Sequence, residues 1–167
     1  MSNSAILAQP KQVAIALGSN LGDSLKLLQN SLQSLALIPG IEIEAVSSWY
    51  QTKPIGPPQP DYLNGCALLS VQQRPEELLV LLQAIEIQFG RVRNEKWGAR
   101  TLDLDLLLYD ELIFNTPSLQ IPHPRMTQRA FVLVPLAEIA PDWIEPRSGK
   151  AITNLVTQVD CSGVTKI

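Results

Sequence analysis

The chain has 167 residues, which is enough for one domain with a substantial core. Hydrophobic residues make up 46% of the chain and charged residues 17%, so its composition is that of a globular rather than a disordered protein. The net charge of −3 argues against general nucleic-acid binding, which needs a clustered basic surface. We therefore expect one domain over residues 1–167, in which residues 1–11 form a loose N-terminal extension.

Cys66 and Cys161 are the only cysteines in the chain. Such widely separated thiols make neither a metal signature nor a disulfide framework, and we expect both to be free in a reducing compartment. The N-terminus lacks the basic start and long apolar stretch of a signal peptide. The apolar run LLVLLQAI is shorter than the ~20 residues of a membrane span, so the sequence predicts a soluble, cytoplasmic protein without membrane contact.

The first part of the chain predicts a strand, a helix and a second strand. The run QVAIALGSN at residues 12–20 is typical of a short buried strand that ends in a glycine turn. Asp23 or Ser24 can cap the following helix, whose leucines recur at helical spacing until the Pro-Gly pair at 39–40. The alternating run IEIEAVSSWY at 41–50 predicts a strand with one wet face.

A stiff loop and the clearest helix follow. The segment QTKPIGPPQPD contains four prolines, which cannot join a central strand because proline lacks an N–H. Its length is that of a binding loop rather than a tight hairpin, and the strand YLNGCALLSV comes after it. The helix RPEELLVLLQAIEIQFG has Pro75 in its first turn, Glu76 and Glu77 at the positive end of its dipole, and Gly90 at its end.

The order of these elements predicts the fold class. A strand around Asp103 and Asp105 completes the order β-α-β-β-α-β, which indicates an α+β fold with a ferredoxin-like core. In this core the helices pack on one face of a mainly antiparallel sheet, and we expect mobile loops over the candidate site. The part after Glu145 is weakly patterned, with one helix expected over 152–158.

Two aspartates within a leucine-rich strand are the strongest functional signal. Aspartate is depleted in strands, and residues two apart share a face, so Asp103 and Asp105 project together while the leucines face the other way. Adjacent carboxylates repel each other unless a cation such as Mg²⁺ lies between them, with phosphate oxygens as further ligands. The alternative is a pair of solvated aspartates that protect an edge strand from aggregation.

A basic segment lies directly upstream. Residues 91–100 hold four cations, Arg91, Arg93, Lys96 and Arg100, against the single Glu95. Arginine forks pair well with phosphate oxygens, which suggests a lid that closes over a polyphosphate. An ordinary solvated surface segment explains these residues equally well.

Several further residues indicate a binding site only when they are considered together. Tyr62, Asn64 and Phe131 could stack on and hydrogen-bond a flat heterocycle, or they could be ordinary core and turn residues. His123, the only histidine, lies between two prolines in a loop and could donate to a phosphate. The run GSNLGD is interpreted as a strand-to-helix turn, and no Walker A pattern occurs.

Together these motifs resemble one family, 6-hydroxymethyl-7,8-dihydropterin pyrophosphokinase of folate biosynthesis. RTLDLDLLLY with PHPRM downstream is the most specific part. The matching pieces occur in the family's order over residues 12–143 and are ALGSNLGD, SSWYQTKPIGPPQPDYLNG, EIQFGRVR, WGARTLDLDLLLYD and IPHPRMTQRAFVLVPLAEIAP.

The resemblance implies an ATP-dependent transferase. It would move a pyrophosphoryl group from ATP to the hydroxymethyl oxygen of the pterin and release AMP. Asp103 and Asp105 would hold two Mg²⁺ ions, and the pterin would stack between Tyr62 and Phe131 while Asn64 reads its edge. The loop residues that match the lining of the pterin pocket are Thr52, Pro54 and Ile55.

The resemblance also implies the residues that contact the nucleotide. Arg91 and Arg100 match arginines of a catalytic loop that would offset the charge of the transferring group and of departing AMP. The remaining positions grouped with ATP binding or with the same loop are Glu86, whose role we leave open, Arg93, Trp97, His123 and Arg129. Pro124 stands where some family members have tyrosine.

Two alternative functions remain open at this point. One is a magnesium-dependent phosphotransferase for another flat heterocycle, and the other is a non-catalytic nucleotide- or RNA-binding module, since ferredoxin-like sheets also bind RNA. The negative charge and the missing exposed-aromatic sheet motif argue against RNA. We expect a monomer that binds small-molecule substrates and no nucleic acid.

Overall fold

A computed structural model describes residues 9–53, 57–90 and 102–167, and it contains the elements of the predicted core in the predicted order. The core elements are β1 (Lys11–Ser19), α1 (Ser24–Ala36), β2 (Ile41–Val46), β3 (Tyr50–Thr52), β4 (Tyr62–Val71), α2 (Pro75–Gln88) and β5 (Asp103–Tyr109). The elements after this core are β6 (Phe114–Asn115), β7 (Gln120–Ile121), the 3₁₀ helix η2 (Met126–Gln128), α3 (Ala130–Ile139), β8 (Ile144–Glu145), β9 (Lys150–Ala151), α4 (Ile152–Val156) and β10 (Val164–Lys166). The helix predicted over 152–158 is therefore present as α4.

The main sheet has the strand order β10-β3-β4-β1-β5, with β2 also paired with β4. Its pairs are antiparallel, with β4 and β1 at the centre. β1 pairs along one edge of β4, so β2 and β3 share the other edge, one after the other. The hairpins β6–β7 and β8–β9 stand apart from this sheet. The predicted α+β, ferredoxin-like arrangement is confirmed.

The strand predicted over 41–50 is interrupted, which corrects the sequence-based prediction. β2 ends at Val46, and the Ser47 side chain takes over a strand hydrogen bond, because its Oγ accepts the N–H of Cys66 at 2.9 Å. The Trp49 ring covers Gly65 on β4, where an added Cβ would lie 2.6 Å from two ring carbons. This break depends on a contact between distant parts of the chain, so the alternating pattern could not predict it.

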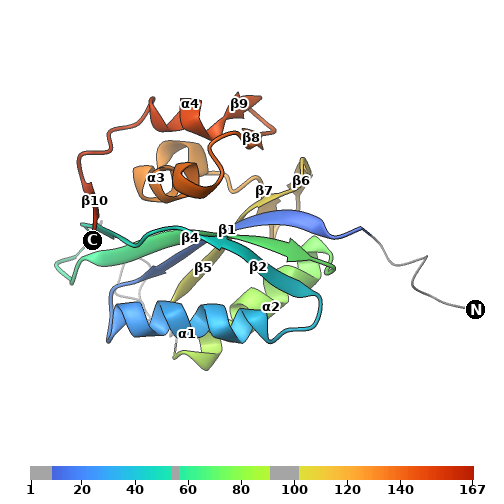
Figure 1. The fold of residues 1–167 in the computed structure, drawn as a ribbon, viewed down its shortest axis with the longest axis horizontal. Helices are drawn as coiled ribbons and strands as arrows, with labels where there is room; N and C mark the ends of the chain where they lie inside the picture. Colours follow the sequence, from blue (N-terminus) through green and yellow to red (C-terminus); the bar gives the residue numbers. More distant parts are fainter. Residues whose placement is uncertain (1–8, 54–56, 91–101) are drawn as a thin grey trace, which may run out of the picture.

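Helices cover both faces of the sheet, whereas the sequence predicted them on one face (Figure 1). α1 and α2 lie below the sheet in this view, and α3 and α4 lie above it. The sequence of α3, AFVLVPLAEI, is apolar almost throughout and contains Pro135, so it shows neither a helical period nor an uninterrupted helix former. For this reason no helix was predicted from the sequence over these residues.

Two apolar clusters fill the spaces on either side of the sheet. The α1–α2 core contains Leu17, Leu69 and Leu104 from the strands with leucines of both helices. The α3–α4 core contains Cys66 and Leu107 from the strands with residues of α3 and α4. The strands β1, β4 and β5 are therefore buried on both faces over most of their length.

At the start of each core helix a side-chain carboxylate accepts a backbone N–H, and the Asp23 cap was predicted from the sequence. The Asp23 side chain accepts the N–H of Lys26 at 3.3 Å at the start of α1. At the start of α2, the Glu77 side chain accepts the N–H of Arg74, the residue before the helix, at 2.9 Å. In the part of the chain that the structure describes, no helix is both long and apolar enough to cross a membrane.

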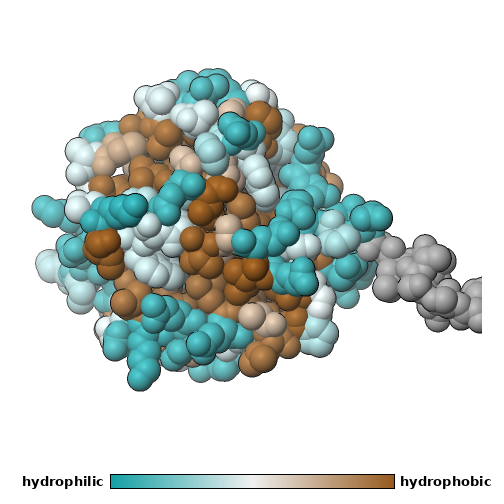
Figure 2. Space-filling model, in the orientation of Figure 1, coloured by the Kyte–Doolittle hydropathy of each residue, from teal (hydrophilic) through white to brown (hydrophobic). Residues whose placement is uncertain are grey.

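Figure 2 shows hydrophilic residues surrounding an apolar band in the middle of the face seen in Figure 1, around β2. Val46, at the end of β2, is 40% exposed. β2 also carries the exposed Glu42 and Glu44. Charged side chains on an edge strand discourage pairing with another chain, because the charges would have to be buried.

We expect Gly65→Ala to lower the free energy of unfolding by about 1–3 kcal/mol, since the new methyl group would force the Trp49 ring or the strand to move. Urea denaturation measures this change. Gly163→Ala is the matched control, because a Cβ at Gly163 meets nothing within 4 Å. Equal stability of the Gly65→Ala variant and the wild type would contradict the close contact with Trp49.

Candidate active site

The two aspartates of β5 lie on the same face of the sheet, as their spacing predicts. Leu104, between them in sequence, packs in the α1–α2 core, so both carboxylates point to the opposite face, where α3 lies. Asp103 is paired with Gly18 of β1, and Asp105 is paired with Ala16. Both aspartates are half-buried. The placement suits a cation held between two carboxylates of one strand.

β5 is an edge strand of the main sheet, and two hydrogen bonds are made along the edge that faces away from β1. The Glu86 Oε2 atom accepts the N–H of Leu104 at 2.7 Å, and the N–H of His123 donates to the carbonyl oxygen of Leu107 at 3.0 Å. Asp105 lies between these two attachment points in sequence. The β5 backbone is therefore fixed on both sides of this residue.

His123 lies beside Asp105 but does not form an ion pair with it near neutral pH. The His123 Nε2 and Asp105 Oδ2 atoms are 4.0 Å apart. Burial, followed by the nearby Arg129, lowers the pKa of His123 to about 4 and outweighs the opposing attraction of Asp103. Because the Nδ1 atom accepts the N–H of Arg125 at 3.2 Å, the proton of the neutral ring is assigned to Nε2. His123 thus presents a neutral N–H donor on the side of the aspartates.

In the metal-free protein we expect the imidazole of His123 to titrate near pH 4. This pKa lies below the ordinary value of 6.5, so as the pH falls the unfolded chain takes up the proton first. The stability that depends on the neutral ring is therefore fully present above pH 6.5 and is lost as the pH falls from 6.5 to about 4. Proton NMR can follow the ring directly, because the chain has one histidine. A midpoint above about 6 would contradict the buried, neutral ring.

Asn64 lies on the same face as the aspartates, close to the centre of the sheet. It is 7% exposed, and its Nδ2 atom donates to the Thr52 Oγ1 atom at 2.7 Å. A Cβ added to Gly18 would lie 3.0 Å from the Asn64 Oδ1 atom and 3.8 Å from the Tyr62 ring. Tyr62 and Asn64 therefore share one face of β4, as residues two apart in a strand should, and Thr52 orients the Asn64 amide.

Gly18 separates the polar groups of β4 from those of β5. It is paired with Asn64 on one side and with Asp103 on the other. Neighbouring strands are about 4.8 Å apart, so the backbones at Asn64 and Asp103 lie about 10 Å from each other, with only a hydrogen atom as side chain between them. A small substrate that contacts both groups would therefore extend across β1 at Gly18.

The first turn of α3 brings an aromatic ring and a cation to this face. Phe131 is half-buried at the edge of the α3–α4 core. The Arg129 guanidinium carbon lies 5.4 Å from the centre of the Phe131 ring, which is within the range of a cation–π contact. A residue expected at the pterin and one expected at ATP are thus neighbours.

The remaining sequence-predicted residues divide into two groups. Glu86 is 2% exposed, and it accepts the backbone N–H of Leu104 on β5. The predicted residues that lie outside the described parts of the chain are Pro54, Ile55, Arg91, Arg93, Trp97 and Arg100.

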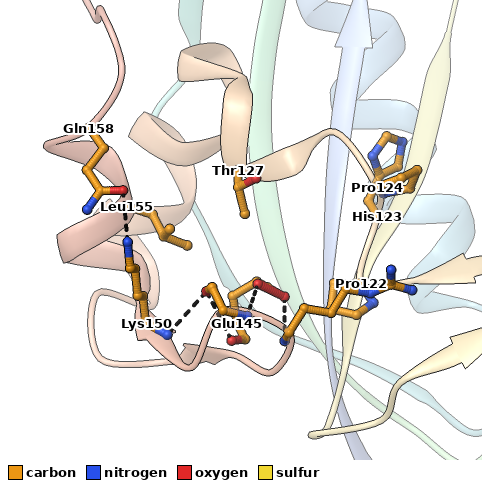
Figure 3. A pocket seen from close by; sticks show the side chains of 10 residues that line it. Pro122, His123, Pro124, Thr127, Glu145, Lys150, Leu155 and Gln158 are labelled. Atoms are coloured by element: carbon orange, nitrogen blue, oxygen red, sulfur yellow. Dashed lines mark hydrogen bonds between the residues drawn. The ribbon is translucent and has the colours of Figure 1, made fainter.

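A pocket of about 420 Å³ lies on the side of the His123 loop that faces the β8–β9 hairpin and α4 (Figure 3). Pro122 and Pro124 line it together with Thr127 of η2, and the hairpin adds Arg147 and Lys150. These two cations were not among the site residues predicted from the sequence. The turn-like run PRSGK, with a cation near each end, was the available signal.

Within the hairpin, Glu145 organises the turn. This carboxylate is 2% exposed and accepts the N–H groups of Arg147 at 2.9 Å and Ser148 at 2.8 Å. The Arg147 side chain reaches Asn115 of β6, and the Lys150 Nζ atom lies 3.3 Å from the Gln158 Oε1 atom. These contacts hold the turn against the rest of the pocket wall.

Comparison with known proteins identifies the family. The family model described as 7,8-dihydro-6-hydroxymethylpterin-pyrophosphokinase (HPPK) matches residues 14–141. The chain belongs to the HPPK family. The 2-amino-4-hydroxy-6-hydroxymethyldihydropteridine pyrophosphokinase of Synechocystis is 57% identical over 150 residues, which cover 90% of this chain and 77% of the relative. The enzyme of the same name from Pseudomonas aeruginosa is 42% identical over 158 residues, which cover 94% of this chain and 97% of the relative.

Solved HPPK-containing structures share the fold. The chain resembles a crystal structure of Plasmodium falciparum HPPK-DHPS with pteroate, with a TM-score of 0.73 and 13% identity. The match covers 90% of this chain and 42% of that one, so the chain spans less than half of the larger protein. At this identity the likeness shows the fold alone. It confirms the ferredoxin-like HPPK architecture that the strand order already indicates.

Proposed function

We propose that this HPPK-family chain transfers the pyrophosphoryl group of ATP to the hydroxymethyl oxygen of 6-hydroxymethyl-7,8-dihydropterin, which gives AMP and the pterin diphosphate for folate biosynthesis. The observation that carries this proposal is the placement of Asn64 and Asp103 on one face of the sheet, on either side of Gly18. In this proposal the Asn64 amide binds the pterin ring and the Asp103 carboxylate lies near the phosphates, so one small substrate can contact both residues.

Asn64, Tyr62 and Phe131 bind the pterin in this proposal. The Asn64 Nδ2 atom is engaged by Thr52, so its Oδ1 atom is directed toward the substrate and accepts from an N–H of the ring edge. Tyr62 and Phe131 come from β4 and from the start of α3, and their rings stack on the two sides of the flat pterin. A buried, oriented amide recognises a hydrogen-bonding ring far better than a ring that lacks those groups.

Asp103 and Asp105 hold two Mg²⁺ ions, and ATP is the co-substrate. The donor set fits, since Mg²⁺ prefers carboxylate oxygens and takes its other ligands from water and substrate phosphates. When bound, the ions neutralise phosphate charge and lower the pKa of a nearby hydroxyl. His123 adds a neutral N–H donor and Arg129 a positive charge on the same side, both directed at phosphate oxygens.

Positioning provides most of the rate enhancement in this proposal. The hydroxymethyl oxygen must meet the β-phosphorus in line with the bond that breaks, and the residues on both sides of Gly18 fix that alignment. Arg91 and Arg100 would offset the charge of the transferring group and of AMP, with Arg93 and Trp97 in the same segment. Pro54 and Ile55 would line the pterin pocket through their backbone. We also propose that the enzyme works as a cytoplasmic monomer without nucleic acid.

Incubation of the protein with ATP and Mg²⁺ tests this function. One sample receives 6-hydroxymethyl-7,8-dihydropterin and others receive flat heterocyclic alcohols, and each is scored for AMP and ADP. We expect AMP that depends on the hydroxymethylpterin. ADP as the product, or equal turnover of another alcohol, would favour the other magnesium-dependent phosphotransferase. Retention of RNA on a filter at moderate salt, without any turnover, would favour the binding module.

A further inference from the structure

Glu86 occupies an unusual place for a carboxylate. It lies in the last turn of α2, where the helix dipole disfavours a negative charge, and it is 2% exposed. Burying a carboxylate is costly unless specific partners compensate for the lost water. The Glu86 Oε2 atom accepts the backbone N–H of Leu104 at 2.7 Å, which provides one such partner.

The Leu104 N–H that Glu86 binds lies at the edge of the sheet. Leu104 is the residue between Asp103 and Asp105, and its N–H points away from β1 at the outer edge of β5. In the interior of a sheet a neighbouring strand would bind this group. At this edge the Glu86 carboxylate takes that place.

We infer that Glu86 is a positioning residue for the two aspartates. By holding the peptide group between them, it fixes the rotation of β5 about its own axis and so the direction of both carboxylates. The His123 N–H bond to Leu107 fixes the strand on the far side of Asp105. This inference rests on the proposed function and gives Glu86 a role that acts through the β5 backbone.

A matched glutamate separates positioning from simple stabilisation. Glu77 lies on the same helix and also accepts a backbone N–H, that of Arg74 at 2.9 Å. Its partner lies at the other end of α2, away from β5. Loss of either bond removes one hydrogen bond made by a side chain of α2. Only loss of the Glu86 bond leaves the Leu104 N–H, between the two aspartates, without this acceptor.

The experiment compares Glu86→Leu, Glu86→Gln and Glu77→Leu in the full chain. Mn²⁺ binding is followed by electron paramagnetic resonance in the presence of an α,β-methylene analogue of ATP, and exchange of the Leu104 amide is followed by NMR. We expect Glu86→Leu to weaken Mn²⁺ binding about 10- to 100-fold, as changes behind a metal ligand commonly do, and to speed amide exchange. Glu86→Gln keeps an acceptor oxygen and should stay within about threefold of the wild type.

Three results would overturn the positioning role of Glu86. Unchanged Mn²⁺ binding in folded Glu86→Leu, or the same loss in Glu77→Leu, overturns the inference. So does a loss in Glu86→Gln as large as that in Glu86→Leu, because charge rather than the hydrogen bond would then matter. If the chain formed no AMP, the proposed function would fail, but the exchange rate of the Leu104 amide would still report whether Glu86 holds the strand.

Discussion

Asp105→Ala is expected to lower kcat about 1000-fold while the affinity for the pterin stays within about twofold of the wild type. Asp105 lies on β5, paired with Ala16, whereas Asn64 and Tyr62 lie across β1 on β4. In the proposed site its removal would take away a cation ligand but no pterin contact. Steady-state turnover and equilibrium titration with the pterin measure the two effects separately.

Asp110→Asn is the control for this variant. Asp110 follows the same strand and has a φ of 47°, a left-handed conformation that asparagine also tolerates. It contacts Gln12 and Lys11 at the far end of β1 from the site. We expect the turnover of Asp110→Asn to match the wild type. A comparable loss of kcat in Asp110→Asn would show that the Asp105→Ala effect comes from disturbance of β5 and not from loss of a metal ligand. Wild-type rates from Asp105→Ala would end the two-metal proposal.

Asn64→Leu is expected to weaken pterin binding about 100-fold without changing the affinity for an ATP analogue. Leucine has a similar volume but neither accepts nor donates, and it leaves the Thr52 hydroxyl without the bond that now orients the amide. Isothermal titration with each ligand alone gives both affinities. Equal weakening of ATP binding would show that the whole face had rearranged.

Gln51→Leu is the control for Asn64→Leu, because it also replaces a side-chain amide by leucine. Gln51 lies on β3 next to Thr52 but points to the opposite face, where its Nε2 atom donates to Asp61 at 3.1 Å. We expect unchanged pterin affinity in this variant. If both variants lose pterin binding, the substrate lies elsewhere than on the Asn64 face.

The parts of the site that the sequence predicted correctly follow from local rules. Alternation along a strand was enough to place Asp103 and Asp105 on one face, and Tyr62 and Asn64 on one face. Residue type and spacing carry this information without any knowledge of the neighbouring elements.

The parts that the sequence missed depend on contacts between distant segments. The break after Val46 needs the Trp49 ring over Gly65, and the helix α3 contains Pro135 within an apolar run. The bond between Glu86 and Leu104 joins the end of α2 to an edge strand, and no local pattern encodes it. Each of these features becomes visible only when the sheet is assembled.

Phosphorus NMR of the completed reaction tests the central claim most directly. With ATP and 6-hydroxymethyl-7,8-dihydropterin in equal amounts, we predict one AMP for each pterin consumed and a pterin product that carries two coupled phosphorus resonances. These resonances come from the β and γ phosphates of ATP, transferred together. A pterin product with a single phosphorus resonance, accompanied by ADP, would contradict pyrophosphoryl transfer by this site.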